Sequence, residues 1–312
     1  MILDFHKARI TDLKYNRQGD RLFVASHDDN VSQWDTSNGV LINKFIHPKR
    51  VNSISITQDS RYLVSAIPGA LSLWNTISGE LLETIDFGYG TYLKCVEFSH
   101  GDTHIVFSYR NVKIQSMIKV YSFNPDNQKK LTHLFTLPII EYDLYGCVTW
   151  SPSNKYILAN VGSRVDIFDV DTRELVHSIH VIGSILNGKI SWTSDQSMFV
   201  IGSNCTTILY ENNTWRLIRS FDIGRRISDA TISSTTPPMI AFATGSTPDC
   251  GYPRRDKQGD LQFNIRLFNL DNTQQVAEIK GHDDPSYSIS FSPDNKSIAI
   301  GGDDGYVIIN QI

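Results

Sequence analysis

The sequence predicts an all-β ring of seven four-stranded blades, because one three-strand pattern recurs at intervals of about forty residues. The third strand of each copy ends on an aromatic or apolar residue followed by a polar one. These pairs are Trp34-Asp35, Trp74-Asn75, Tyr121-Ser122, Phe168-Asp169, Tyr210-Glu211 and Phe268-Asn269, with a degenerate last instance at Asn310. Successive pairs are separated by 40, 47, 47, 42, 58 and 42 residues. A repeat of this length is typical of a β-propeller.

The first and second strands of each copy follow the same period. First strands are expected at Ile10–Asn16, Val51–Thr57, Leu93–Ser99, Tyr145–Ser151, Gly188–Ser194, Ile227–Ser233 and Tyr287–Pro293. A polar turn and a short second strand, such as RLFVAS or YLVSAI, follow each of them. Short β-branched and aromatic runs bounded by Gly, Asp, Asn and Ser are typical of strands. No segment has a sustained 3.6-residue apolar period, so we expect almost no helix.

An outer fourth strand follows in six of the seven copies. It is expected at Val40–Phe45, Glu80–Ile85, Lys130–Phe135, Glu174–Ile179, Arg216–Phe221 and Gln275–Lys280. The seventh copy lacks one, because the sequence ends at Ile312 directly after the third strand. The apolar segment Met1–Phe5 has a suitable length to cover the backbone groups that an open edge would expose. We therefore expect residues 1–5 to complete the seventh blade and close the ring.

The repeats predict a single domain. Its expected blades span residues 6–45, 46–87, 88–138, 139–181, 182–222, 223–280 and 281–312, the last completed by residues 1–5. A chain of 312 residues can bury roughly three quarters of the surface that it exposes when unfolded. Such a core needs neither a disulfide nor a metal ion to hold it together.

The cysteines and the charge exclude several classes of function. Cys95 and Cys147 fall in first strands, where a small buried side chain fits, and no Cys-x-x-Cys spacing predicts a zinc site or a redox pair. The sequence has no apolar signal region and no run of 18 apolar residues, so we expect a cytosolic or nuclear protein that does not bind membranes. A net charge of −4 gives no reason to expect autonomous nucleic-acid binding.

The sixth copy contains an insertion that accounts for its interval of 58 residues. It spans about residues 247–260, and its Pro and Gly residues predict a loop. Arg254, Arg255 and Lys257 make this loop basic. The loop is either a solvated surface feature or a contact for a phosphate backbone or a partner's acidic patch, and both interpretations stay open.

Motifs for catalysis are incomplete wherever they occur. Gly88-Tyr89-Gly90 lacks the third glycine and the helix of a dinucleotide-binding turn. Asp86-Phe87-Gly88 occurs without the other motifs of a kinase, and no Gly-x-Ser-x-Gly elbow is present. We therefore expect no enzyme activity, no cofactor and no metal ion.

A polar set in the first copy has a structural interpretation. His6, Ser26, Asp28 and Trp34 are spaced so that an Asp–His pair, a hydroxyl and an indole N–H meet inside one blade. Burying such groups without partners costs about 1–3 kcal/mol each, so they are expected to satisfy one another. His282 and Asp304 repeat part of the set in the seventh copy, whereas copies two to six lack most of it. A catalytic His-Asp-Ser set is disfavoured, because these groups lie away from any cleft.

The Trp-Asp pair at Trp34-Asp35, its degenerate copies and this polar set are typical of WD40 repeats. Two stretches, Lys14–Phe23 (KYNRQGDRLF) and Lys280–Val307 (KGHDDPSYSISFSPDNKSIAIGGDDGYV), resemble subunit i of eukaryotic translation initiation factor three. That family is a seven-bladed WD40 propeller with a long insertion in blade six, a place that Gly245–Phe268 occupies in this sequence. The insertion here lacks the family's Thr-rich, Gly-Gly sequence, and the family's aromatic, acidic tail is missing.

The resemblance implies a non-catalytic scaffold in the cytoplasm that acts in translation initiation on the small ribosomal subunit. Its implied partners are the C-terminal helix of the b subunit and a segment of the g subunit. The b-subunit contact is implied around blades five and six, with Asp195, Leu209 and Glu211 at the matching positions. Leu209 would otherwise be a core residue and the two acids solvated. The alternative function is a WD40 adaptor or substrate receptor of another complex, such as a ubiquitin ligase.

Overall fold

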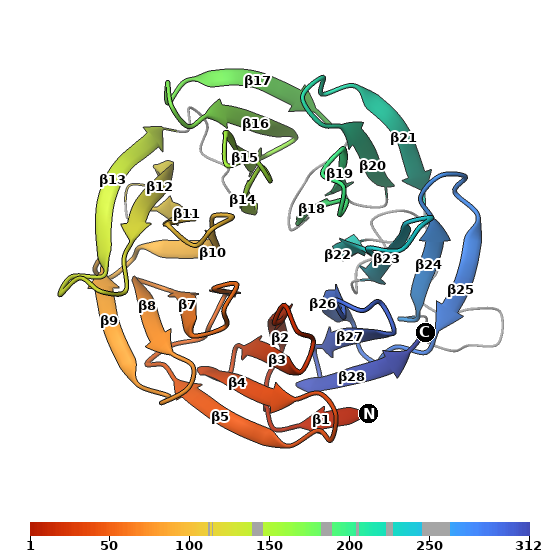
Figure 1. Cartoon of the computed structure of the whole chain (residues 1–312), viewed down its shortest axis with the longest axis horizontal. Coiled ribbons are helices and arrows are strands. Elements are labelled where there is room, and N and C mark those ends of the chain that lie inside the picture. Colours follow the sequence, from red (N-terminus) through yellow and green to blue (C-terminus); the bar gives the residue numbers. More distant parts are fainter. Residues whose placement is uncertain are drawn as a thin grey trace.

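The computed structural model of the protein describes residues 1–111, 113, 115–138, 146–181, 189–203, 206–222, 227–244 and 263–312. Within these residues the chain forms seven four-stranded antiparallel sheets and no helix, and hence no helix long and apolar enough to cross a membrane. The sheets stand side by side as the blades of a closed ring (Figure 1). The predicted seven-bladed β-propeller is confirmed.

Each blade runs outward from the centre of the ring in chain order. Blade one contains β2 (Ile10–Tyr15), β3 (Arg21–Ser26), β4 (Asn30–Asp35) and β5 (Leu41–Ile46). Blade two contains β6 (Ser53–Ile56), β7 (Tyr62–Ile67), β8 (Ala70–Asn75) and β9 (Leu81–Asp86). Blade three contains β10 (Tyr92–Phe98), β11 (His104–Arg110), β12 (Ser116–Phe123) and β13 (Leu131–Pro138). Blade four contains β14 (Val148–Trp150), β15 (Tyr156–Val161), β16 (Arg164–Asp169) and β17 (Leu175–His180).

The remaining blades follow the same order until the last. Blade five contains β18 (Ile190–Trp192), β19 (Met198–Ser203), β20 (Thr206–Glu211) and β21 (Leu217–Asp222). Blade six contains β22 (Ile227–Ile232), β23 (Met239–Thr244), β24 (Ile265–Asn269) and β25 (Gln275–Ile279). Blade seven contains β26 (Ser286–Phe291), β27 (Ser297–Gly302) and β28 (Tyr306–Gln311), and its outer strand is β1 (Ile2–Asp4).

The aromatic residue of the recurring pair marks a β-bulge in six blades. In each of them the register between the third and fourth strands shifts immediately before that residue, as between Gln33 and Trp34 in blade one. A bulge increases the local twist, which lets the outer strand bend around the ring. Trp34 and Trp74 are buried there, so the sequence signature marks both a packing position and a bend.

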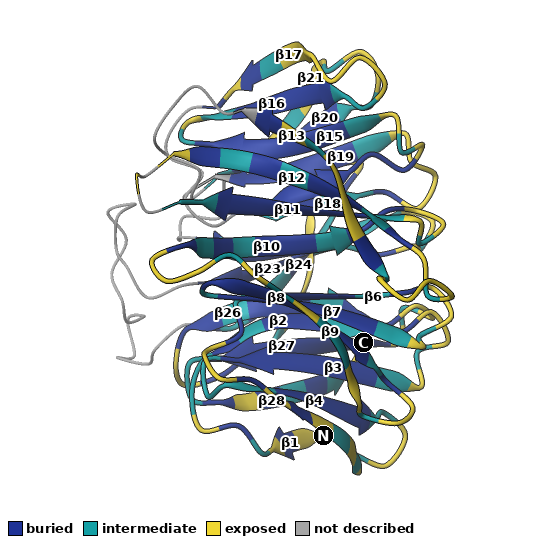
Figure 2. Cartoon of the chain, turned by 90° about the vertical axis from the view of Figure 1, so that its left-hand side faces the viewer, coloured by how far each residue is buried: buried dark blue, intermediate teal, exposed yellow. Residues whose placement is uncertain are grey.

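The core lies between neighbouring blades rather than within them. Both faces of a blade are covered, so the second and third strands are buried along most of their length, whereas the turns at the two rims are exposed (Figure 2). Phe45 and Val51, for example, pack with Phe23 of blade one against Trp74 of blade two. Burial of large apolar side chains between sheets is the main stabilising term of this arrangement.

The first strand closes the ring as predicted. β1 pairs antiparallel with β28, and Leu3 lies opposite Val307. The backbone N–H of Ile309 donates to the carbonyl oxygen of Met1 at 2.8 Å. Leu3 is 2% exposed and packs with Trp34 of blade one, whereas Ile2 is 66% exposed. The strand therefore both completes the sheet of blade seven and fills the interface with blade one.

Leu3 and Ile2 provide a matched test of this closure. Replacing Leu3 by Ala should lower the free energy of unfolding by about 2–5 kcal/mol, because it leaves a cavity between blades seven and one. Replacing Ile2 by Ala should change it by less than about 0.5 kcal/mol, because that side chain faces solvent. Urea denaturation followed by tryptophan fluorescence measures both values. Equal effects of the two substitutions would contradict the closure.

Candidate functional site

The acidic residues implied as partner contacts lie together at one rim of blade five. Asp195 is exposed in the turn between β18 and β19, and it accepts hydrogen bonds from Thr193 Oγ1 at 2.6 Å and Ser197 Oγ at 2.7 Å. These bonds, chiefly the one from Thr193, lower the pKa of Asp195. The carboxylate is therefore charged and held in a fixed orientation at neutral pH.

Glu211 ends β20 beside this turn. The backbone N–H of the following residue, Asn212, donates to the carbonyl oxygen of Ser197 at 2.8 Å, which joins the two turns. Glu211 Oε2 accepts hydrogen bonds from Thr214 Oγ1 at 2.6 Å and from Arg216 Nε at 3.4 Å. The bond from Thr214 is the main reason that the pKa of Glu211 is lowered. Two negative charges thus share this rim of blade five.

The apolar member of the predicted contact has a different environment. Leu209 is 2% exposed and packs with Val200 and Phe242 in the interface between blades five and six. Its side chain therefore lies in the core. The exposed apolar side chains near Glu211 are Leu217 and Ile218 on the outer strand β21, at 54% and 37% exposure. Leu217 lies directly opposite Tyr210, the residue before Glu211.

The basic loop of blade six lies outside the described residues. Arg254, Arg255 and Lys257 all fall in the range 245–262, so the prediction that this loop contacts a partner or a phosphate backbone stays a prediction.

The polar set of blade one forms a chain of hydrogen bonds. His6 Nδ1 lies 3.0 Å from the Asp28 carboxylate, and His6 Nε2 lies 2.7 Å from Ser32 Oγ. The Trp34 indole, which can only donate, donates to Ser32 Oγ at 2.7 Å. The Asp28 carboxylate can only accept, so Nδ1–H donates to it, and Nε2 of a neutral ring then accepts from the Ser32 O–H. Burial would raise the pKa of Asp28, but the hydrogen bonds that its carboxylate accepts, chiefly from His6, hold it at about 2.

Ser26 has a different role from the one predicted. Its Oγ donates to the carbonyl oxygen of Ala8 at 2.9 Å and accepts from the backbone N–H of Asp28 at 3.1 Å. The hydroxyl that joins His6 to Trp34 belongs instead to Ser32. Ser32 lies two residues before Trp34 on β4, so both side chains point to the same face of the sheet. That spacing is visible in the sequence and could have identified Ser32.

Blades two and seven contain related sets. In blade two, Ser65 Oγ lies 2.7 Å from His47 Nε2 and accepts a bond from the Trp74 indole at 3.3 Å, so this blade keeps more of the set than the sequence indicated. In blade seven, His282 Nδ1 lies 2.8 Å from Asp304 Oδ2. These groups are buried between strands, where they satisfy one another and leave no surface for a substrate.

Because of His47, the free energy of unfolding should depend on pH. Burial lowers its pKa from 6.5 to about 4, so the unfolded chain binds a proton in this range that the folded protein does not. The free energy of unfolding should therefore fall as the pH drops from 6.5 towards 4. Denaturation across this range should compare the free energy of unfolding of the wild type with that of His47→Asn. The excess stability of the wild type should shrink as the pH approaches 4. A difference that is constant with pH would contradict the buried neutral state of His47.

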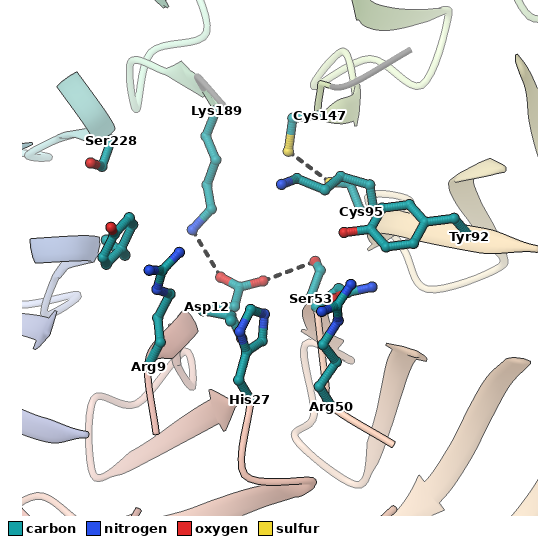
Figure 3. Close-up of a pocket in the computed structure, with 14 residues that line it drawn as sticks. Arg9, Asp12, His27, Arg50, Ser53, Tyr92, Cys95, Cys147, Lys189 and Ser228 are labelled. Carbon is teal, nitrogen blue, oxygen red and sulfur yellow. Dashed lines mark hydrogen bonds and ion pairs between the residues drawn. The ribbon is translucent and has the colours of Figure 1, made fainter. Parts of the chain in front are cut away.

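A pocket of about 270 Å³ opens at the mouth of the central channel (Figure 3). Inner strands from several blades contribute to it. Lys189, just before β18, points from blade five towards Asp12 of blade one, and its Nζ lies 2.9 Å from Asp12 Oδ1. The same Nζ lies 2.9 Å from Asp229 Oδ2 of blade six and 3.3 Å from Ser288 Oγ of blade seven. One ammonium group thus links four blades.

Asp12 and Asp229 occupy the same position in their first strands, ITD and ISD. Each carboxylate also reaches the next blade: Asp12 Oδ2 accepts from the backbone N–H of Ile54 at 3.0 Å, and Asp229 Oδ2 from that of Ile289 at 3.1 Å. Burial disfavours the ammonium of Lys189, but the two carboxylates outweigh it and raise its pKa well above the usual value. The charged groups of this network pair with one another, which favours a structural role over acid–base catalysis.

Removing Lys189 should destabilise the ring. Lys189→Met leaves Asp12 and Asp229 buried without their counter-charge, at a cost of about 3–5 kcal/mol in the free energy of unfolding at pH 7. Lys296→Met is the control, because the Lys296 side chain is 79% exposed, and its effect should be under about 0.5 kcal/mol. Superimposable denaturation curves for wild type and Lys189→Met would show that the network contributes nothing to stability.

Among the described residues, no group of three or more His, Cys, Asp or Glu side chains is placed to hold a metal ion. Comparisons with known proteins identify the relatives of this chain. The family model "WD domain, G-beta repeat" matches residues 1–35 and 273–309. The chain is 35% identical to "Eukaryotic translation initiation factor 3 subunit I" of Dictyostelium discoideum, over 99% of this chain and 93% of that protein.

The chain belongs to the family of eukaryotic translation initiation factor 3 subunit I. Proteins of the same name from Xenopus tropicalis and Neurospora crassa are each 26% identical to it, over 99% and 100% of this chain and 95% and 90% of theirs. The WD40 model matches at blades one and seven, where the described residues include the hydrogen-bonded pairs His6–Asp28 and His282–Asp304. The resemblance predicted from the sequence is confirmed.

Proposed function

We propose that this protein is a non-catalytic scaffold of the translation initiation factor three complex, which binds the b and g subunits and acts with them on the small ribosomal subunit. The observation that carries the proposal is the match to subunit I of that factor along the whole chain, at 35% identity with the Dictyostelium discoideum protein. The channel supports a non-catalytic role, because its carboxylates at Asp12 and Asp229 are both paired with Lys189. We expect the protein to work in the cytoplasm, where translation initiation takes place.

The rim of blade five is the surface that we propose for the b subunit. Asp195 and Glu211 supply two fixed negative charges, which suit a basic partner helix. Among the described residues, the cation paired with Glu211 is Arg216, whose side chain is 72% exposed, and such a surface pair is weak enough for a partner cation to displace. Leu217 and Ile218 are the exposed apolar anchors beside these charges, because Leu209 is buried.

Charge reversal tests this surface. Asp195→Lys combined with Glu211→Lys should reduce recovery of the b subunit in co-purification by at least about tenfold, because two attractions become repulsions. Wild-type binding should itself weaken as salt is raised, since screening acts on exposed charges. Leu217→Ser should weaken binding without this change in salt dependence. The melting temperature of each variant should match the wild type.

The matched control reverses equivalent charges on other blades. Asp294 lies in the corresponding turn of blade seven, where it accepts a bond from Ser292 Oγ at 2.7 Å, and Asp169 ends the third strand of blade four as Glu211 does in blade five. Asp294→Lys with Asp169→Lys should leave the b subunit bound. Full binding by the blade-five double variant would refute this surface. Mass spectrometry that recovers ubiquitin-ligase subunits instead of initiation factors would refute the proposed function.

A further inference from the structure

Two thiols from neighbouring blades meet at the mouth of the channel. Cys95 lies on β10 of blade three and Cys147 directly before β14 of blade four, and their Sγ atoms are 2.7 Å apart (Figure 3). This distance exceeds a disulfide bond of about 2.05 Å, and both residues are free cysteines. Sequence spacing predicted no redox pair, because it considered only short Cys-x-x-Cys motifs. The ring instead brings together two residues that are 52 positions apart.

We propose that Cys95 and Cys147 form a reversible oxidation site, at which a peroxide joins blades three and four through a disulfide. The site goes beyond the scaffold function and is independent of it.

Small oxidants have access to the pair from the channel. Both cysteines line the pocket of about 270 Å³, together with Lys94 and Lys189. Cys95 itself is 7% exposed, whereas Cys147 is half-buried. The pocket is large enough for water and peroxide, and the burial of Cys95 hinders its contact with a sulfur atom of another chain. Oxidation within the chain is therefore favoured over cross-links between chains.

The two thiols are chemically unequal. A hydrogen bond joins the two sulfur atoms, and this bond lowers the pKa of Cys95 although burial opposes the change. The same bond raises the pKa of Cys147 well above its usual value, because the proton is held between the two sulfurs. Cys95 is thus the thiol that ionises more readily and attacks an oxidant, and Cys147 is the thiol that resolves the product.

The reaction balances with one peroxide per pair. The Cys95 thiolate attacks one peroxide oxygen, the O–O bond breaks, and the departing hydroxide takes a proton from solvent to become water. Cys95 is then a sulfenic acid. The Cys147 sulfur attacks the Cys95 sulfur, and the hydroxyl group leaves with the Cys147 proton as a second water. Two thiols have lost two electrons and two protons, and hydrogen peroxide has been reduced to two waters.

Oxidation should link blades three and four covalently and stabilise the folded protein. A disulfide restricts the unfolded chain, and the effect grows with the length of the closed loop. For the 52-residue separation here, the oxidised protein should melt roughly 5–10 °C above the reduced protein. Dithiothreitol should reverse the shift.

The test uses the full chain, freed of reductant and treated with a small excess of hydrogen peroxide. Alkylation under denaturing conditions should label two of the four cysteines in the oxidised protein and all four after dithiothreitol. Peptide mapping without reductant should recover one cross-linked species that contains Cys95 and Cys147. Differential scanning fluorimetry on the same samples should show the rise in melting temperature.

Substitutions separate this pair from the other two cysteines. Cys95→Ser and Cys147→Ser should each abolish both the cross-link and the thermal shift, whereas Cys205→Ser combined with Cys250→Ser should retain both. Peptide mapping of the wild type decides the question even if a serine variant fails to fold. Free Cys95 and Cys147 after peroxide treatment, separate sulfinic acids at the two positions, or disulfides formed mainly between chains would each overturn the proposal.

Discussion

The pairing of the first strand with the last blade is the constraint on which the rest of the structure depends. β1 is the one strand of blade seven that comes from the other end of the described chain. Its Leu3 side chain packs in the interface with blade one. Without this pairing, β28 would have an open edge and a buried apolar cluster would face water. Every blade packs against two neighbours, so closure at this one interface constrains all the others.

A second set of contacts holds the ring from inside. Asp12 and Asp229 each reach from one blade to the next, and Lys189 joins both across the channel. Because Lys189 pairs with both carboxylates, this network stabilises the inner wall of the ring. The outer rims carry the remaining exposed charges and apolar side chains, such as Glu211 and Leu217 on blade five. A rigid ring with free rims suits a protein that holds other polypeptides in place.

The spacing of strands and turn residues along the sequence predicted the ring and its closure, because each strand and turn is determined by residues close together in the sequence. It named Ser26 and did not consider Ser32, the hydroxyl that joins His6 to Trp34, since it did not follow which side chains share a face of β4. Leu209 is buried because each blade is covered on both faces: Leu209 faces blade six, and Tyr210 faces blade four. The alternation of side chains between the two faces of such a strand therefore does not show which of them are exposed. The contact of Lys189 with Asp12, across 177 positions, exists only once the ring has closed.

Hydrogen exchange of the free protein tests this account most directly. If the ring is closed through β1, the backbone amide of Ile309, which is bonded to Met1, should exchange as slowly as amides in the interior strand β3. Exchange of the Ile309 amide at the rate of an unstructured peptide, with β3 still protected, would show an open ring and contradict the account.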